Sequence, residues 1–233
     1  MRISTSRRNG NSILIVFAVL TPIVLGILYS GFIDSHPLAI GLLGNQSVNS
    51  TQGNRWTYDR DIVGGLPEGA NSLSGNWIIR LETDSPSPPN AICQTETAKF
   101  QALILSDTVY EDVFITTRFK TISGQTDQAA GLIFREQDSE NYYILRANAL
   151  EGNVNLYKYV AGAQILIKSS SANVTSGQWQ ILQVESIGNR IRGLLNGHLL
   201  IEVVETTFNT GKIGLWTKSD SITCFDNTST IVQ

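Results

Sequence analysis

The sequence predicts an all-β protein, an antiparallel β-sandwich or barrel, preceded by one N-terminal transmembrane helix. Three observations predict it. After residue 54, short segments alternate apolar and polar residues with period two, as strands with one buried side do. Turn-forming residues separate these segments, and no strand alternates with a helical pattern. The first 33 residues instead contain one long apolar run.

The apolar run at residues 12–33 carries no charged side chain. Its length is enough to cross a hydrocarbon core of about 30 Å as a helix that rises about 1.5 Å per residue. Arginines precede the run and Asp34 follows it. The positive-inside rule therefore places the N-terminus in the cytoplasm and the remainder outside. We expect a single-pass protein of the cell membrane whose C-terminal domain is extracytoplasmic.

The chain divides into four parts on this interpretation: a cytoplasmic N-terminus at 1–11, a signal anchor at 12–33, a tether at 34–53 and the β-sandwich at 54–233. The tether has no sustained period and ends in polar, turn-forming residues. A cleaved signal peptide is the alternative to the anchor, but its apolar region is usually only about 7 to 15 residues long. A retained anchor and a cleaved signal peptide both predict that the β-sandwich domain is exported.

Charge and histidine content exclude several functions. The chain has 17 Lys+Arg and 20 Asp+Glu, a net charge of -3, without blocks of one sign, so a nucleic-acid partner is not expected. Its two histidines are His36 in the tether and His198 after a turn. Two such distant imidazoles predict neither a histidine metal site nor a Ser/His/Asp relay.

The two cysteines, Cys93 and Cys224, both lie in the exported part. An oxidising compartment lets a disulfide persist there, so we expect them to pair. Such a bond would close a loop of about 130 residues and stabilise the fold by about 4 kcal/mol in the chain-entropy description. The alternative is two buried thiols that pack as small apolar groups.

Individual strands follow from the alternation. Val113, Ile115 and Phe119 fall on one side of a strand, with polar and basic residues on the other. Asn196-Gly197 between two apolar runs predicts a hairpin, because both central residues of a type I′ turn need positive φ. We predict that the side chain of Trp179 belongs to the hydrophobic core of the domain. The other strands are expected at 130–135, 142–146, 154–160, 179–185, 191–195, 198–203, 211–217 and 221–227.

The stretch REQDSEN at 135–141 carries the Glu-x-Asp-x-Glu spacing of many sandwich-fold glycosidases. Carboxylates that alternate along a strand can line a cleft only if the intervening residues enter the core. Here those residues are Gln137 and Ser139, which do not suit a core. The stretch therefore reads as a hairpin loop, and Glu136 and Asp138 remain weak catalytic candidates.

Several phrases resemble those of a known group. They are WTYD at 56–59, GLP at 65–67, GNW at 75–77, GLIFR at 131–135, NYY at 141–143, RANALE at 146–151, GQW at 177–179 and GLWTKSDS at 214–221. Together they resemble the concanavalin A-like, laminin-G-like jelly rolls, and within these the 3-keto-disaccharide hydrolase, or family-sixteen-like, domains. The resemblance runs from about Arg55 to the C-terminus. It implies glycan binding or glycoside chemistry.

The segment 211–227 is the best candidate for a ligand surface. Trp216, Lys218 and Asp220 share one side of a strand if the strand continues that far. An indole face packs against the C–H face of a pyranose, while charged and amide groups bond its hydroxyls. The alternative places Trp216 in the core and the other two in a surface turn. Residues expected to join from neighbouring strands are Arg135, Arg146 and Asn148.

Three functions remain open at this point. The first is a glycan-binding, lectin-like module without catalysis. The second is cleavage of 3-keto-glycosides, with Glu136, Asp138 or Asp220 as the base and Lys218 or Arg146 as the electrophile. The third is a structural surface module held by protein contacts, with an exposed apolar patch.

Cofactors are not expected, except for a structural calcium ion, which such jelly rolls often carry. The oxygen ligands nearest to one another in the sequence are those of Asp220, Asp226 and Asn227. The alternative for these residues is a solvated loop or a satisfied turn.

Overall fold

The computed structural model describes residues 53–233, and its regular elements are all β-strands. No helix in this part of the chain is long and apolar enough to span a membrane. The strands are β1 Arg55–Trp56, β2 Asn71–Ser74, β3 Trp77–Leu81, β4 Asn90–Gln94, β5 Ala98–Ile104, β6 Val113–Ser123, β7 Ala129–Asp138, β8 Asn141–Asn148, β9 Asn153–Val160, β10 Ala163–Ser171, β11 Gln180–Ile187, β12 Arg190–Leu195, β13 His198–Val204, β14 Lys212–Ser219 and β15 Ile222–Val232. The predicted anchor at 12–33 and nearly all of the tether lie outside the described residues.

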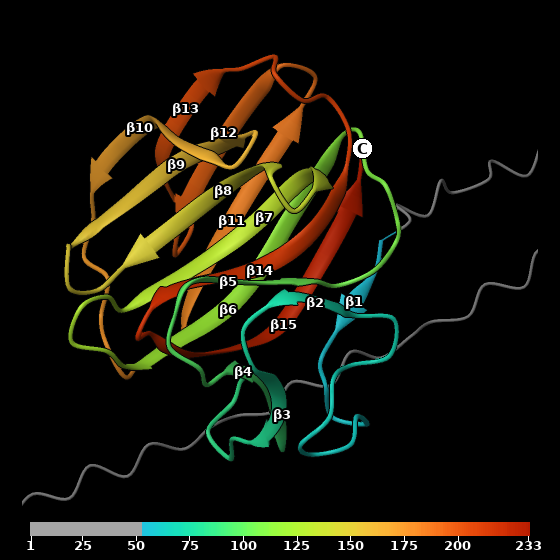
Figure 1. The fold of residues 1–233 in the computed structure, drawn as a ribbon, viewed down its shortest axis with the longest axis vertical. Coiled ribbons are helices and arrows are strands. Elements are labelled where there is room, and N and C mark those ends of the chain that lie inside the picture. Colours follow the sequence, from blue (N-terminus) through green and yellow to red (C-terminus); the bar gives the residue numbers. More distant parts are fainter. Residues whose placement is uncertain (1–52) are drawn as a thin grey trace, which may run out of the picture. The chain divides into compact units, whose positions relative to one another are not determined.

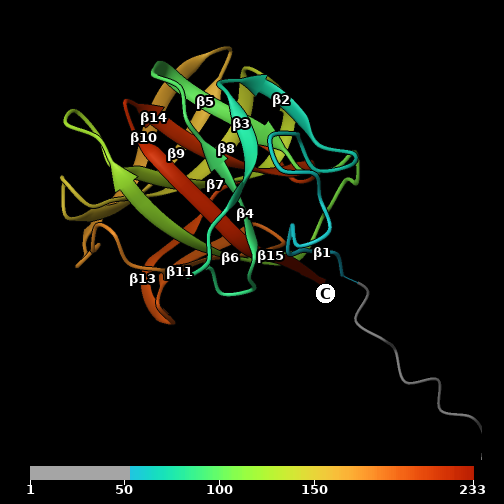
Figure 2. The same ribbon diagram turned by 90° about the horizontal axis from the view of Figure 1, so that it is seen from below.

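The strands form two antiparallel sheets, which confirms the predicted sandwich. Sheet A has the order β13-β12-β11-β6-β15-β4-β3, and β1 also pairs with β15. Sheet B has the order β10-β9-β8-β7-β14-β5-β2. Figure 1 shows the strands of sheet B lying across those of sheet A, and Figure 2 shows β1 beside the C-terminal strand.

The main core lies between the two sheets and uses the predicted alternation. Val113, Ile115 and Phe119 of β6 are at most 1% exposed and belong to this core. Leu182 and Val184 of β11 pack into the same cluster. Apolar side chains at every second position are removed from water, each fully buried one contributing about 2 kcal/mol.

The hairpin expected at Asn196-Gly197 joins β12 to β13. Both residues have positive φ, 52° and 79°, as a type I′ turn requires. Asn196 also accepts the backbone N–H of Ile181 through its Oδ1 at 2.8 Å, which ties the turn to β11.

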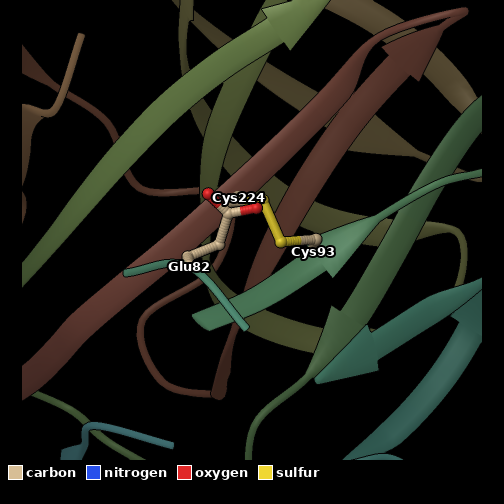
Figure 3. Close-up of side chains that lie close together, drawn as sticks. All are labelled: Glu82, Cys93 and Cys224. Carbon is tan, nitrogen blue, oxygen red and sulfur yellow. A yellow bond between two sulfur atoms is a disulfide. The ribbon is translucent and has the colours of Figure 1, made fainter. Parts of the chain in front are cut away.

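Cys93 and Cys224 form the predicted disulfide. They are directly paired across β4 and β15, and both are fully buried. Figure 3 shows the carboxylate of Glu82 next to the sulfur atoms. Glu82 and Asp84 form ion pairs with Lys120 at 2.9 and 2.7 Å. The disulfide is therefore covered on the outer side of sheet A by charged side chains.

The assignment of Trp179 to the main core is wrong. Gln180 begins β11, and Gln180, Leu182, Val184 and Ser186 are its buried positions, so residue 179 has the opposite parity. Trp179 is half-buried outside sheet A, where it packs against the disulfide cluster and lies under Lys120. Side chains alternate along a strand, and Trp179 lies three residues before Leu182. The sequence should therefore have placed Trp179 on the opposite side of the strand from Leu182.

Glu205 links the two sheets and makes the stability depend on pH. Burial raises the pKa of Glu205, but hydrogen bonds from Thr207, Lys158 and Thr206 outweigh it and lower the pKa from 4.5 to about 2. Lys158 lies on β9, and its Nζ is 3.2 Å from the Glu205 carboxylate after β13. The stabilisation is therefore present above about pH 4.5 and is lost as the pH falls towards about 2.

Replacing Glu205 with glutamine is expected to remove about 2 kcal/mol of stability at pH 7, allowing for solvent screening. The variant should also lose less stability than the wild type between pH 4.5 and 3. Urea unfolding of both proteins at several pH values measures this. Parallel stability curves for wild type and Glu205→Gln would contradict the assignment.

Candidate functional site

The outer face of sheet B, turned away from sheet A, brings together most of the predicted ligand residues. Along β14, Ile213 and Leu215 point into the main core, whereas Trp216 belongs to a separate apolar cluster on the other side. Lys218 has the parity of Trp216 and reaches Asp127 with its Nζ at 3.2 Å. The predicted common side of Trp216 and Lys218 is therefore observed.

Strand register places four of these outer-face positions in one row. Trp216 of β14 pairs with Gly131 of β7, Gly131 pairs with Arg146 of β8, and Arg146 pairs with Asn155 of β9. A Cβ on Gly131 would lie 3.2 Å from the Trp216 Cβ and 3.3 Å from its Cε3. The missing side chain of Gly131 thus leaves room for the indole to lie over the sheet.

The ring of Trp216 is not exposed, which agrees with the alternative of a packed residue and not with an open stacking platform. It is 0% exposed and packs with Tyr142, Tyr159 and apolar neighbours. The rings of Tyr142 and Tyr159 stack with centroids 4.7 Å apart. The apolar cluster fills the middle of the outer face. Because the sheet curves, side chains from different strands of sheet B meet above its surface.

One end of this face is polar and partly open. Arg146 bonds both carboxylate oxygens of Glu151, and its Nη2 donates to Asn153 Oδ1 at 3.0 Å. The Glu151 side chain is 39% exposed and that of Lys218 is 34% exposed. Arg146 also lies over the ring of Tyr157 at 5.4 Å. We call Arg146, Glu151, Asn153, Tyr157 and Lys218 the polar end.

Asn148 supports the polar end from below. It is fully buried, and its Nδ2 donates to Asp127 Oδ1 at 2.8 Å. Its Oδ1 accepts the backbone N–H groups of Leu150 and Glu151. Asn148 therefore positions Asp127 and the turn that carries Glu151, and its own amide is not open to a ligand.

Arg135 does not join this face, so its assignment to a ligand surface is corrected. It is 1% exposed, and its guanidinium donates to the carbonyl oxygens of Phe208 at 3.0 Å and Gly188 at 2.6 Å. A third, longer bond of 3.4 Å reaches Glu111. Burial lowers the pKa of Arg135. Arg135 fastens three loops at one end of the sandwich.

The stretch REQDSEN is a strand with a bulge rather than a loop, which corrects a second expectation. β7 runs to Asp138, and only Ser139 and Glu140 form the turn to β8. Arg135 has a φ of 50°, and the register shifts between Phe134 and Asp138. The irregular stretch holds two more residues than the facing part of β8, which interrupts the alternation, so polar residues here need not enter the core.

Glu136 is the carboxylate in this stretch with acid–base character. It is 6% exposed, and its Oε2 is buried without a hydrogen-bond partner. Burial raises the pKa of Glu136, while Lys212 opposes this and Asp138 adds to it. Lys212 pairs with Glu136 across the strands and bonds Asp107 at 2.7 Å. Glu136 and Lys212 form a second polar group on sheet B, at the far end of β14 from Lys218.

The other two catalytic candidates are occupied by structural hydrogen bonds. Asp138 accepts the backbone N–H of Glu140 and the amide of Asn141, which lower the pKa of Asp138. Asp220 lies after the end of β14, and backbone N–H groups of Gln125 and Asp127 lower the pKa of Asp220. Both carboxylates stay ionised and close turns.

The three candidate calcium ligands all accept hydrogen bonds from other groups of the protein. Asp220 accepts N–H groups from residues 125–127, whereas Asp226 accepts from the backbone and hydroxyl of Ser87. Asn227 Oδ1 accepts from Arg55 at 2.7 Å. Among residues 53–233, the one close group of three potential metal ligands is Glu82 with the two cysteines, and their sulfur atoms are bonded to each other.

Sequence reasoning missed Glu151, Asn153, Tyr157 and Phe100. The first two lie at the turn between β8 and β9, only a few residues beyond the predicted strand end. Tyr157 alternates with Tyr159 in the predicted strand 154–160, so its side could have been assigned once that of Tyr159 was known. Phe100 lies on β5, which no clear alternation marks.

Comparison with known proteins gives a family and a fold. The family model described as the 3-keto-alpha-glucoside-1,2-lyase-like domain matches residues 65–229. No curated protein matches the chain.

Solved structures resemble the sandwich at low identity. The carbohydrate-binding module CBM66 from Bacillus subtilis is 20% identical with a TM-score of 0.61, over 70% of this chain and 95% of that one. A lichenase from a mouse hindgut metagenome is 13% identical with a TM-score of 0.52, over 77% and 98%. A putative glycosyl hydrolase from Parabacteroides distasonis is 17% identical with a TM-score of 0.50, over 71% and 94%. These likenesses show the fold.

Proposed function

Because the chain belongs to the family of 3-keto-alpha-glucoside-1,2-lyase-like domains, we propose that it binds a neutral glycan at the polar end of sheet B. The observation that carries the proposal is the arrangement of Glu151, Lys218 and Tyr157. A partly exposed carboxylate, ammonium and aromatic ring lie together beside a buried apolar cluster. Such a set provides hydrogen bonds for hydroxyls and an apolar surface for C–H groups.

The charge of the polar end favours a neutral ligand. Arg146 is paired with Glu151, and Lys218 with Asp127. Each cation is therefore already neutralised, and an anionic sugar would have to displace a carboxylate. The carbohydrate-binding module from Bacillus subtilis, named for this activity, supports sugar binding on the same fold.

Two lysines of β14 provide a matched test. Lys218 and Lys212 lie on the same strand, each is 34% exposed and each is paired with an aspartate. We expect Lys218→Met to weaken binding of neutral oligosaccharides about tenfold, and Lys212→Met to leave it unchanged. Isothermal titration of both variants and of Glu151→Gln measures this. Equal affinities for all three variants and the wild type would rule out the polar end as the site.

A second function is favoured by Glu136. A lyase acting on a 3-keto-glucoside needs a base to remove the proton at carbon 2, next to the ketone, while the carbon 1–oxygen bond breaks. Glu136 has a buried carboxyl of raised pKa and Lys212 for a neighbour, which could hold the oxyanion at carbon 3. On this proposal the reaction occurs at the opposite end of sheet B from the polar end.

Incubation with a 3-keto-disaccharide separates the two functions. A lyase would release the leaving sugar from the wild type, and Glu136→Gln would lower the rate about a hundredfold or more. Lys218→Met should then affect release less than Lys212→Met. If the wild type releases sugar no faster than buffer does, the lyase function is ruled out and glycan binding remains as the proposed function.

The proposed location rests on the sequence. The apolar run at 12–33 and the arginines before it would hold the sandwich on the outer side of a membrane. The domain would there meet glycans of the surroundings or of the cell surface. Protease accessibility of the domain on intact cells tests this orientation, since an internal domain would stay uncut.

A further inference from the structure

Two aromatic side chains close the middle of the outer face of sheet B. Phe100 lies on β5 and Tyr159 on β9, with β14, β7 and β8 between them. Four strand spacings correspond to about 19 Å along a flat sheet. Nevertheless, the two rings meet edge-on with centroids 5.7 Å apart. The sheet must therefore curve, and both side chains must lean across it.

Trp216 lies in the cluster closed by this contact. It has no exposed surface, and Phe100 and Leu73 are the half-buried residues that pack against its cluster. The small outer-face residues Gly131, Ala102 and Gly214 surround Trp216 on neighbouring positions. Phe100 and Tyr159 thus cover the indole on the side away from the sheet. On the sheet itself, the positions next to Trp216 carry small residues or no side chain.

One buried donor in this row lacks a partner. The Nε of Arg146 makes no hydrogen bond, whereas the indole of Trp216 is a hydrogen-bond partner of the Tyr142 hydroxyl, which opposes the rise that burial causes in the pKa of Tyr142. Arg146 and Trp216 are at most 2% exposed, and only Gly131 separates them in the strand register. A buried unpaired donor costs about 1 to 3 kcal/mol and calls for an explanation. A ligand oxygen that accepts from the Arg146 Nε would supply that explanation.

We propose that Trp216, Gly131 and Arg146 form a closed subsite for one pyranose ring, and that Phe100 must turn aside to open it. A sugar ring suits the subsite because its C–H face can lie on the indole while a hydroxyl oxygen accepts from the Arg146 Nε. The inference rests on the proposed glycan binding and adds a second, inner position next to the polar end, since Arg146 belongs to both.

Phe100 is the movable part of the cover. Its outer-face neighbour on β5 is Ala102, and the pairing of β5 with β14 shifts register beside Phe100, between Lys218 and Ser219 of β14. Phe100 is half-buried, whereas Tyr159 is 4% exposed and stacked on Tyr142. Turning Phe100 therefore breaks fewer contacts than turning Tyr159.

The first experiment needs no sugar. The full chain is held in a polyoxyethylene detergent, because glycoside detergents would present sugars themselves. The four tryptophans give four indole N–H signals in a nitrogen–proton spectrum, and Trp216→Phe identifies the one from Trp216. We expect Phe100→Ala to speed hydrogen exchange at this indole at least tenfold. Phe114→Ala, a half-buried phenylalanine on sheet A, is the matched control and should leave it unchanged.

Slow exchange of the Trp216 indole in Phe100→Ala would overturn the role of Phe100 as cover, whatever sugars bind. If alanine unfolds the sandwich, Phe100→Leu keeps most of the apolar volume and should give a smaller acceleration. The spectrum of the remaining amides shows in each case whether the fold is intact.

The second experiment adds maltotriose, laminaritriose and cellotriose in turn. Binding should shift the Trp216 indole signal, and Phe100→Ala should bind about five to tenfold more tightly, because the wild type must first open. Binding that leaves the indole signal unmoved and the affinity of Phe100→Ala unchanged would overturn the subsite but retain the polar end. Absence of binding by both proteins would overturn the proposed function and the sugar assignment together, leaving the exchange result to report on the cover alone.

Discussion

Replacing Cys93 and Cys224 together with alanine is expected to lower the free energy of unfolding by about 4 kcal/mol. The disulfide joins residues 131 apart in the chain, so it removes many conformations from the unfolded state. Alanine keeps the Cβ atoms next to Ala91, and the cavity left by the two sulfur atoms is small. The loss should therefore come mainly from the unfolded chain, in the entropic description of crosslinks.

Guanidinium chloride unfolding of the wild type, with and without a reducing agent, and of the double variant measures this effect. Reduced wild type and variant should unfold at similar denaturant concentrations, well below that of the oxidised protein. A loss of less than 1 kcal/mol in the variant would mean that the unfolded chain is already compact around β4 and β15, or that the bond is not formed in the purified protein.

The fold could be predicted where one side of a strand faces water and the other the core. β6 and the hairpin at Asn196-Gly197 meet this condition, and both are observed. β10 does not meet it. It is an edge strand exposed at most positions and ends in three serines, so neither side shows an apolar pattern. Sheet edges of this kind leave little trace in the sequence.

The candidate site could be predicted only within single strands. The alternation of side chains along a strand predicts that Trp216 and Lys218 lie on one side of β14, and the structure confirms this. Trp216 is covered by the contact of Phe100, on the neighbouring strand β5, with Tyr159 of β9, and three strands separate these two rings in the sheet. Because period two says nothing about contacts across a curved sheet, the sequence could not decide between an exposed and a packed ring of Trp216.

Arg135 is a second residue whose role could not be predicted from its strand alone. Its replacement is the other change with a large expected effect. Replacing it with methionine should lower the free energy of unfolding by about 3 to 4 kcal/mol. Its guanidinium serves the carbonyl oxygens of Phe208, Gly188 and Glu111, and no carboxylate forms an ion pair with it within 4 Å among the described residues. Methionine would fill the space but leave these oxygens without donors.

Lysine should rescue little of this loss, because one ammonium cannot reproduce the planar fork that reaches three separate loops. Arg146→Met is the matched control. It removes another buried guanidinium, but the partner left behind, Glu151, is 39% exposed and can be solvated. We therefore expect Arg135→Met to lower the urea midpoint without changing sugar affinity in the folded protein, and Arg146→Met to weaken sugar binding with a smaller loss of stability. The reverse pattern would return Arg135 to the ligand surface and remove Arg146 from it, since a residue that only fastens loops cannot contribute directly to binding.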